Sequence, residues 1–426
     1  MDEKKRGNSG FFKWLGNDLK DIGQTFARGD WKTRLSFLIM GFGQLCRGQI
    51  VRGLSLLALQ GGLLYFIFGF GWQYLTKILT LGTVETHREG RVTVYGHNSF
   101  FILLYGILVI VAVLALIYLW RLNLRQNRDA EHLLSIGKRL PSNKEDLGSL
   151  LDKNFDKTLL ALPVLGIFIF TVLPIIFMIC IAFTNYDVTH QPPSKLFTWV
   201  GLQNFKELFG IGGTGNFGGT FFYVLGWTLL WAFFATFLTY FLGMAVAILI
   251  NKKGIKLKKL WRTILVLTIA VPQFVSLLYV GKMFAVDGLV NAFLMRWGWI
   301  STPINFWANA TSARIDGANA FQSFRKITLP YMLFVTGPFL LTQFIGNLNN
   351  FNVIFLLNQG NPKSMSLAKN AGATDLLVTW LYKMTINDSN YKIAAVIGIM
   401  VFLVTAVISL VVYNTMPSVK DEEGFQ

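Results

Sequence analysis

Several runs of apolar residues, each about long enough to cross a lipid bilayer, constrain this chain more than any other feature of its sequence. About 20 consecutive apolar residues cross the hydrocarbon core as a helix. Inside the bilayer every backbone polar group needs an internal partner, so each run predicts a helix. The fold class predicted is an all-α polytopic membrane protein. The runs are 53–72, 100–120, 158–183, 221–250, 263–283, 331–347 and 392–413.

The basic residues lie mainly in short segments between these runs. They give the 426-residue chain a net charge of +17, although only 14% of its residues are charged. An excess of Lys and Arg in short loops marks the cytoplasmic side of a membrane protein, so the charge predicts orientation and no nucleic-acid partner. Membrane lipid is an expected partner, but orientation alone accounts for the strongest basic cluster. That cluster consists of Lys252, Lys253, Lys256, Lys258, Lys259 and Arg262.

Polar segments separate the runs into parts. The N-terminal part shows no signal-peptide cleavage pattern, and its apolar stretch at 35–45 is too short to cross, which predicts an interfacial or re-entrant helix. The longest internal polar segment, at 121–157, is more typical of a solvated linker than of a binding domain. We expect a basic cytoplasmic segment at 1–52, an accessory two-helix membrane hairpin at 53–120, a cytoplasmic linker at 121–157, a transmembrane core at 158–414 and a tail at 415–426.

No arrangement of residues typical of catalysis occurs in the sequence. It lacks a glycine-rich phosphate loop ending in Gly-Lys-Ser or Gly-Lys-Thr, and it has no recognisable Ser/His/Asp or Cys/His set. The four histidines are scattered without carboxylates or thiols at ligand spacing, and the two cysteines make no disulfide framework. Acidic residues lie almost wholly in loops, so no proton relay is indicated. We expect no enzymatic activity, metal or cofactor in this chain.

Residues 313–330 form a moderately polar segment of helical propensity in an otherwise very apolar protein. The segment reads Ala-Arg-Ile-Asp-Gly-Ala-Asn-Ala-Phe-Gln-Ser-Phe-Arg-Lys-Ile-Thr-Leu-Pro. Its Gly317–Ala318 pair permits the close approach of a second backbone, and Pro330 closes it before the next apolar run. Apolar side chains recur in it at helical spacing, which alone would indicate only an amphipathic surface helix.

This segment resembles the EAA loop of ABC importer permeases, a short cytoplasmic helix that sits in a cleft on the ATPase subunit. The likeness rests on the Ala-x-x-Asp-Gly-Ala start, the aromatic-containing helix and the Ile-x-Leu-Pro end. It implies that 313–330, called the coupling helix below, couples this chain to a partner ATPase that binds ATP and Mg²⁺. The residues that match the family pattern are Ala313, Asp316, Gly317, Ala318, Phe324, Ile327, Leu329 and Pro330.

Two further segments resemble MalF-type permeases of sugar importers, namely Phe-Thr-Asn-Tyr-Asp at 183–187 and Trp-Val-Gly-Leu-Gln-Asn-Phe at 199–205. With them the resemblance covers nearly the whole chain after residue 158. It implies a type I ABC importer (MetI-like) transmembrane fold in a bacterial plasma membrane, with the N-terminus cytoplasmic. A MalG-like second permease subunit, an ABC ATPase dimer and an extracellular sugar-binding protein are the implied partners. The expected function is the permease subunit of an ATP-driven oligosaccharide importer, with maltose or maltodextrin as the expected sugar.

The sequence departs from the family immediately before the coupling helix. Thr311-Ser312 stand where the family has Glu-Ala, and residues 287–312 contain no run long enough for the membrane helix that the family places there. The sequence therefore predicts a core that is incomplete near 312–313 and an odd number of crossings. Two alternatives to a working importer stay open. One is a transport-deficient deletion variant of such a permease, and the other is an ion-coupled secondary transporter that needs no ATPase.

A cluster of amides lies beside aromatic residues at the end of the apolar run 331–347. Residues 346–352 read Gly-Asn-Leu-Asn-Asn-Phe-Asn. Amides donate to and accept from sugar hydroxyls, and aromatic faces cover the C–H patches of a sugar ring. The cluster is also typical of helix caps and of hydrogen bonds between membrane helices. Its Asn-x-x-Asn-Phe pattern resembles the part of MalF-type permeases that contacts maltose, which implies that Asn347, Asn350 and Phe351 bind substrate.

Overall fold

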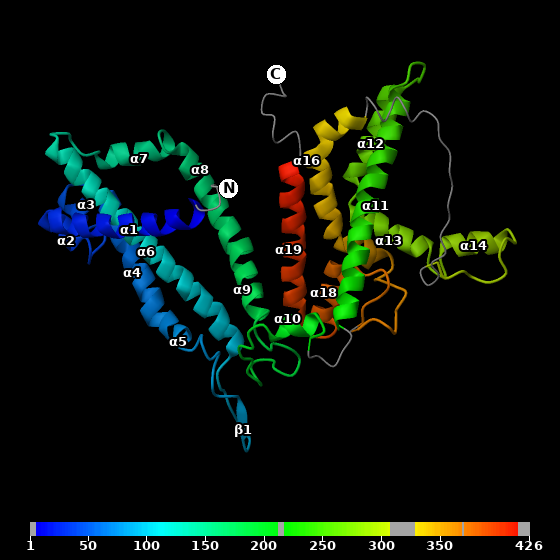
Figure 1. Ribbon diagram of the computed structural model, residues 1–426, viewed down its shortest axis with the longest axis horizontal. Helices are drawn as coiled ribbons and strands as arrows, with labels where there is room; N and C mark the ends of the chain where they lie inside the picture. The colour runs from blue at the N-terminus through cyan, green and yellow to red at the C-terminus, as the bar shows by residue number, and fades with distance from the viewer. Residues whose placement is uncertain (1–5, 212–216, 307–328, 369, 416–426) are drawn as a thin grey trace. The chain divides into compact units, whose positions relative to one another are not determined.

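The computed structural model describes the chain except for residues 1–5, 212–216, 307–328, 369 and 416–426 (Figure 1). The chain divides into two compact units. The first consists of Met1–Met178 and Gln191–Trp199, and the second of Ile179–His190 and Val200–Gln426. The division between the units falls within a long helix, later in the chain than the predicted boundary at 157/158.

The first unit is built on three long helical segments, one at each of the three apolar runs predicted there. They cover Ile50–Leu75, Ser99–Ser135 and Phe155–Ile181, and each is long and apolar enough to cross a membrane. Its elements are α1 (Arg6–Arg28), α2 (Trp31–Leu35), α3 (Phe42–Cys46), α4 (Ile50–Leu64), a π-helical turn (Tyr65–Gly71), α5 (Trp72–Leu75), β1 (His87–Glu89), β2 (Val92–Val94), α6 (Ser99–Ser135), α7 (Asn143–Leu151), α8 (Phe155–Ile167), a second π-helical turn (Phe168–Val172) and α9 (Leu173–Ile181).

Helix α6 continues well beyond the predicted crossing at 100–120. Its start is fixed by Asn98, whose side-chain oxygen accepts hydrogen bonds from the backbone N–H groups of Phe100 (3.0 Å) and Phe101 (3.3 Å). Its end at Ser135 is followed by Gly137, which has a φ of +74° as expected of a glycine beyond a helix C-terminus. Much of the segment predicted as a linker at 121–157 is therefore helical, first as the end of α6 and then as α7.

A nearly buried arginine holds the N-terminal helices against the polar end of α6. The Arg47 side chain is 2% exposed, and its guanidinium lies 2.8 Å from Asp30, 3.3 Å from Glu131 and 2.6 Å from the side-chain oxygen of Asn127. The stretch 35–45, predicted as one interfacial or re-entrant helix, is instead divided between α2 and α3. They are joined by turns that include Gly41, where a Cβ atom would meet the Gly53 carbonyl oxygen at 2.1 Å.

The second unit contains the rest of the helices, and three of them lie side by side in it. Helix α16 packs between α11 and α19 (Figure 1), and α18 packs against α19. The buried side chains of Trp380, Ile393 and Ile397 form part of this core. The elements are α10 (Gln203–Leu208), α11 (Phe217–Asn251), α12 (Lys258–Leu267), a 3₁₀ turn (Thr268–Ala270), α13 (Gln273–Met283), α14 (Leu289–Arg296), α16 (Leu329–Leu348), α17 (Phe351–Leu357), α18 (Leu377–Ile386) and α19 (Tyr391–Thr415).

The apolar run at 263–283 does not form the single span that its hydropathy predicts. Helix α12 ends at Leu267, one 3₁₀ turn follows, and α13 starts only at Gln273. Pro272 causes the break, because it has no N–H to donate and forces the preceding Val271 into an extended conformation (φ −86°, ψ 119°). Helix α13 packs against α17. Neither α12 nor α13 is among the described helices that are long and apolar enough to cross a membrane.

Candidate functional site

The predicted substrate residues lie where one membrane helix breaks into two. Helices α16 and α17 meet at an angle of 41° across a short break. Asn350 causes α17 to start anew, because its side-chain oxygen caps the helix by accepting a hydrogen bond from the backbone N–H of Val353 (3.2 Å). Asn347 lies in the last turn of α16, and Phe351 is the first residue of α17.

The structure brings Asn347 and Asn350 together. The Asn350 side-chain nitrogen donates to the Asn347 side-chain oxygen (3.4 Å), and the Asn347 nitrogen donates to the hydroxyl of Thr236 on α11 (3.0 Å). Thr236 is buried, whereas both asparagines are half-buried. These contacts are helix–helix and capping bonds of the kind that the sequence left open. An amide has two donor hydrogens and an acceptor oxygen with two lone pairs, so each asparagine keeps capacity for a further ligand.

Phe351 belongs to an aromatic cluster that only partly follows from the sequence. Its ring stacks on that of Phe355 with centroids 4.6 Å apart, and it meets the Tyr382 ring edge-to-face at 5.0 Å. The Phe355 and Tyr382 rings lie 4.9 Å apart. The i, i+4 spacing of the two phenylalanines on α17 could have indicated their contact. Nothing in the sequence indicates Tyr382, which comes from α18.

A buried carboxylate organises the loop between α17 and α18. The Asp375 side chain is fully buried, and it lies 2.6 Å from the ammonium group of Lys383. It also accepts hydrogen bonds from the Gly372 N–H (2.6 Å) and the Thr379 hydroxyl (2.9 Å). Gly360 must be glycine here, because a Cβ atom at its φ of +77° would lie 2.1 Å from the carboxylate. The loop conformation therefore depends on one buried carboxylate.

Helix α11 fixes the same loop from its other side. The indole N–H of Trp227 donates to the carbonyl of Thr374 (3.1 Å). The hydroxyls of Thr228 and Thr220 accept hydrogen bonds from the backbone N–H groups of Leu377 (3.0 Å) and Ala368 (2.8 Å). Since α11 also holds Asn347 through Thr236, one helix positions both the asparagine pair and the loop.

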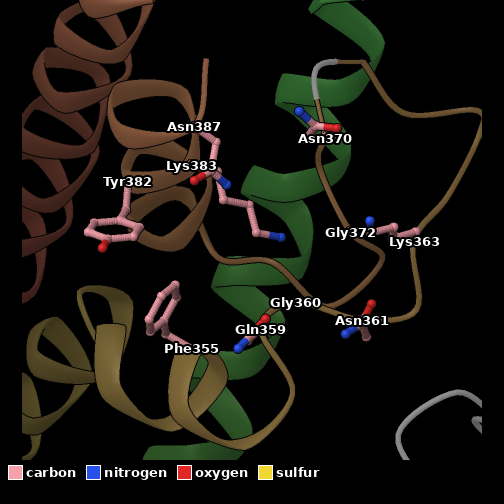
Figure 2. Close-up of a pocket in the computed structure, with 10 residues that line it drawn as sticks. All are labelled: Phe355, Gln359, Gly360, Asn361, Lys363, Asn370, Gly372, Tyr382, Lys383 and Asn387. Atoms are coloured by element: carbon pink, nitrogen blue, oxygen red, sulfur yellow. The ribbon is translucent and has the colours of Figure 1, made fainter. Parts of the chain in front are cut away.

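A cavity of about 430 Å³ opens between this loop and α18 (Figure 2). The volume lies within the usual range for small-molecule sites. Its wall combines two aromatic rings from the cluster with side-chain amides and ammonium groups. The lining residues are Phe355, Gln359, Gly360, Asn361, Lys363, Asn370, Gly372, Tyr382, Lys383 and Asn387.

The motif at 183–187 fastens a second loop to the start of α19. Asp187 lies 2.9 Å from the Lys392 ammonium group, and the Tyr186 and Tyr391 rings stack with centroids 4.4 Å apart. Partial burial raises the pKa of Asp187, but hydrogen bonds from Thr189 and His190 and the ion pair with Lys392 outweigh it, so the pKa lies well below its ordinary value of 3.8.

The K392M variant, Lys392→Met, is expected to lower the stability of the second unit by about 1–2 kcal/mol. A carboxylate whose pKa is depressed by folding contributes stability that is complete above its unfolded pKa and is lost as pH falls through the folded value. The loss should therefore be constant between about pH 5 and pH 8 and should diminish only in stronger acid. Thermal unfolding in detergent across this range measures it. Lys206→Met, at an exposed lysine without an acidic partner among the described residues, is the control. A loss that varies between about pH 5 and pH 8 would contradict the assignment.

Most of the predicted coupling residues fall outside the described part of the chain. These are Ala313, Asp316, Gly317, Ala318, Phe324 and Ile327. Leu329 and Pro330 are the first two residues of α16, a position where proline is favoured because its missing N–H would have no helical partner. The segment predicted to couple to an ATPase therefore precedes, in the chain, the helix that carries Asn347 at its other end.

The fold and the site together define the class of the chain, a helical multi-pass membrane protein with a broken helix pair that carries an amide and aromatic cluster. Comparison with known families gives a match over residues 310–420 to the model described as "Binding-protein-dependent transport system inner membrane component". The galactooligosaccharides transport system permease protein GanP of Bacillus subtilis is 33% identical, over 90% of this chain and 97% of that protein. The maltodextrin transport system permease protein MdxF of the same organism is 30% identical, over 94% of this chain and 98% of that protein.

The chain belongs to this family, the MalF-type permeases of ABC importers. The maltose/maltodextrin transport system permease protein MalF of Escherichia coli is 28% identical over 50% of this chain and 48% of its own length. Among solved structures, a chain from a bacterial ABC transporter involved in the import of the acidic polysaccharide alginate aligns with a TM-score of 0.45 and 20% identity, covering 63% of this chain and 97% of that chain. The family assignment rests on the sequence relatives.

Proposed function

We propose that this chain forms the translocation pathway for a neutral oligosaccharide of the maltodextrin class in an ATP-driven importer. The observation that carries the proposal is the meeting of the Asn347 and Asn350 amides at the break between α16 and α17, next to the aromatic ring of Phe351. Paired amides can bind neighbouring sugar hydroxyls, and an aromatic face packs on the apolar side of a sugar ring. The named sugars of the relatives, maltodextrin and galactooligosaccharides, support a substrate of this chemistry.

The position of α16 supplies a route for coupling. It has 20 residues, or about 30 Å of helix, and runs from the end of the coupling helix to the asparagine pair. In the proposal an ABC ATPase dimer, which binds ATP and Mg²⁺, moves the coupling helix as it closes. Helix α16 transmits that motion to the substrate residues, so that ATP and the sugar bias one equilibrium between outward and inward access.

The remaining partners and the orientation are part of the same proposal. A MalG-like second permease subunit completes the pathway, and an extracellular binding protein delivers the sugar. The N-terminus and the basic segment 252–262 face the cytoplasm, in agreement with the positive-inside rule. The chain itself carries out no chemistry on ATP.

A transport-deficient variant is the second candidate, and two observations favour it over a secondary transporter. The alignment with MdxF is 445 positions long, more than the 426 residues of this chain, so that relative has residues that this chain lacks. The family match begins at residue 310, beside the predicted junction at 312–313.

Asn350→Ala is expected to lower the rate of oligosaccharide uptake about 10- to 100-fold, because a buried hydrogen bond to a sugar hydroxyl is lost and its partner is left unpaired. Uptake of labelled maltotriose and sugar-stimulated ATP hydrolysis by the reconstituted assembly measure the effect. Asn349→Ala is the matched control, since Asn349 is exposed and its side chain bonds only to the Ile345 carbonyl among the described residues. Equal uptake by the Asn350→Ala variant and the unmodified assembly would contradict the proposed site. An unmodified assembly whose ATP hydrolysis does not respond to sugar would identify the transport-deficient variant.

A further inference from the structure

The cavity between the 358–372 loop and α18 has more hydrogen-bonding capacity than the protein uses. The side chains of Gln359, Lys363, Tyr382 and Asn387 line it and take no hydrogen-bond partner among the described residues. Asn361 uses its side-chain nitrogen to bond the Asn358 carbonyl (2.8 Å), which leaves its own oxygen available. Figure 2 shows these groups arranged around one opening rather than spread along a face. A set of amide, hydroxyl and ammonium groups of this kind complements a ligand rich in hydroxyls.

The cavity shares part of its aromatic wall with the cluster that contains Phe351. Phe355 and Tyr382 form part of its wall, and both rings contact Phe351, the residue that follows Asn350. A sugar chain that places its first two rings beside the asparagine pair and Phe351 would direct its later rings along these aromatic faces. Aromatic surfaces of this type pack against the C–H faces of pyranose rings.

The frame of the cavity is held rigidly. Asp375 fixes the loop through Gly372 and Lys383, and α11 fixes it through Thr374 and Leu377. Two lining residues, Gln359 (φ +54°) and Asn370 (φ +56°), adopt the left-handed backbone region. This region costs a non-glycine residue of order 1 kcal/mol or more, and such strain concentrates at functional sites.

We propose that this cavity is an outer carbohydrate subsite that holds the third and later rings of an oligosaccharide whose first two rings lie beside Asn347, Asn350 and Phe351. The proposal rests on the proposed function. The subsite selects for chain length, so that a trisaccharide gains contacts there that a disaccharide does not reach. Neutral sugar is the ligand class, because the Lys383 charge is compensated by Asp375 at 2.6 Å and leaves Lys363 as the one lining cation without an acidic partner in the described part of the chain.

The test uses the complete assembly in lipid nanodiscs and equilibrium binding of labelled maltose and maltotriose. The double variant Gln359→Ala/Asn387→Ala is expected to weaken maltotriose binding about five- to tenfold and to leave maltose binding unchanged. Tyr382→Phe, which keeps the ring and removes only the hydroxyl, is expected to weaken maltotriose binding about two- to fivefold. Met365→Ala is the matched control, because Met365 is on the same loop and is fully exposed outside the cavity.

The outcomes separate this inference from the proposed function. If Asn350→Ala weakens both sugars while the double variant binds maltotriose normally, the outer subsite is refuted and the proposed function stands. If no variant, Asn350→Ala included, changes the binding of either sugar, the proposed function itself fails. Stronger binding of an oligogalacturonate than of maltotriose, abolished by Lys363→Ala, would overturn the neutral-sugar assignment. Equal weakening of maltose and maltotriose by the double variant would also refute selection by chain length.

Discussion

Replacing Asp375 by alanine is expected to destabilise the second unit by about 3–5 kcal/mol, because removing one member of a buried ion pair leaves the other charge without compensation. The Asp375 side chain is fully buried and that of Lys383 is 12% exposed, with 2.6 Å between the carboxylate and the ammonium group. The substitution also removes the acceptor for the Gly372 N–H and the Thr379 hydroxyl. Thermal unfolding of the purified protein in detergent, together with limited proteolysis at the 358–376 loop, measures the loss.

A double-mutant cycle isolates the ion pair. Lys383→Met alone should also destabilise, but the combination with Asp375→Asn should cost less than the sum of the single losses, since neither charge then remains unpaired. Lys363→Met, at an exposed lysine on the same loop without an acidic partner among the described residues, serves as the control. Additive losses, or a loss below about 1 kcal/mol for Asp375→Ala, would mean that the carboxylate does not organise the loop.

The sequence predicted the long helices well, because an uninterrupted apolar run leaves the backbone few options inside a membrane. The prediction of a single span at 263–283 was wrong, because it followed the mean hydropathy of the run and neglected the effect of Pro272 on the preceding residue. It also placed a linker directly after Trp120, although α6 continues to Ser135. Polar residues in a helix that leaves the membrane look the same in sequence as polar residues in a loop.

The candidate site likewise combines residues that are neighbours in the sequence with residues that only the fold brings together. Asn347, Asn350 and Phe351 are close in sequence, so their pattern could be recognised before their contacts were known. The cavity joins Phe355 on α17 to Tyr382 and Asn387 at α18, with Gln359 on the loop between. Its formation depends on Asp375, whose part in closing the loop becomes evident only when Gly360 and Gly372 are seen against it. The spacing of these residues along the chain does not reveal their contact with Asp375.

A single cysteine at Ser323 in the coupling helix is expected to be fully protected from a membrane-impermeant thiol reagent in intact cells and labelled once the cells are opened. The sequence alone gave seven crossings, an odd number that conflicted with a cytoplasmic coupling helix. In the structure 263–283 is broken at Pro272, and neither α12 nor α13 is by itself long and apolar enough to cross a membrane. Among the described residues five helices are candidate spans, and counting α16 and α17 as one bent span raises the number to as many as six.

If 258–283 does not cross and the N-terminus is cytoplasmic, the chain returns to the cytoplasm at 252–262 and also begins α16 on that side, so the coupling helix would fall on the side of the ATPase. The experiment starts from a Cys46→Ser/Cys180→Ser background, which removes both native thiols. Lys253→Cys is the matched inner control, and Met365→Cys, at a fully exposed position in the loop between α17 and α18, is the outer control.

Labelling of the Ser323 cysteine from outside, with both controls behaving as expected, would mean that 258–283 crosses the membrane despite its break. The coupling helix could then never meet an ATPase, and the chain would be a transport-deficient relative of the importers it resembles. Protection would instead indicate that the broken segment 258–283 does not cross the membrane, which would leave the coupling helix on the cytoplasmic side. The side of the membrane on which residue 323 lies therefore distinguishes a working permease from a transport-deficient one.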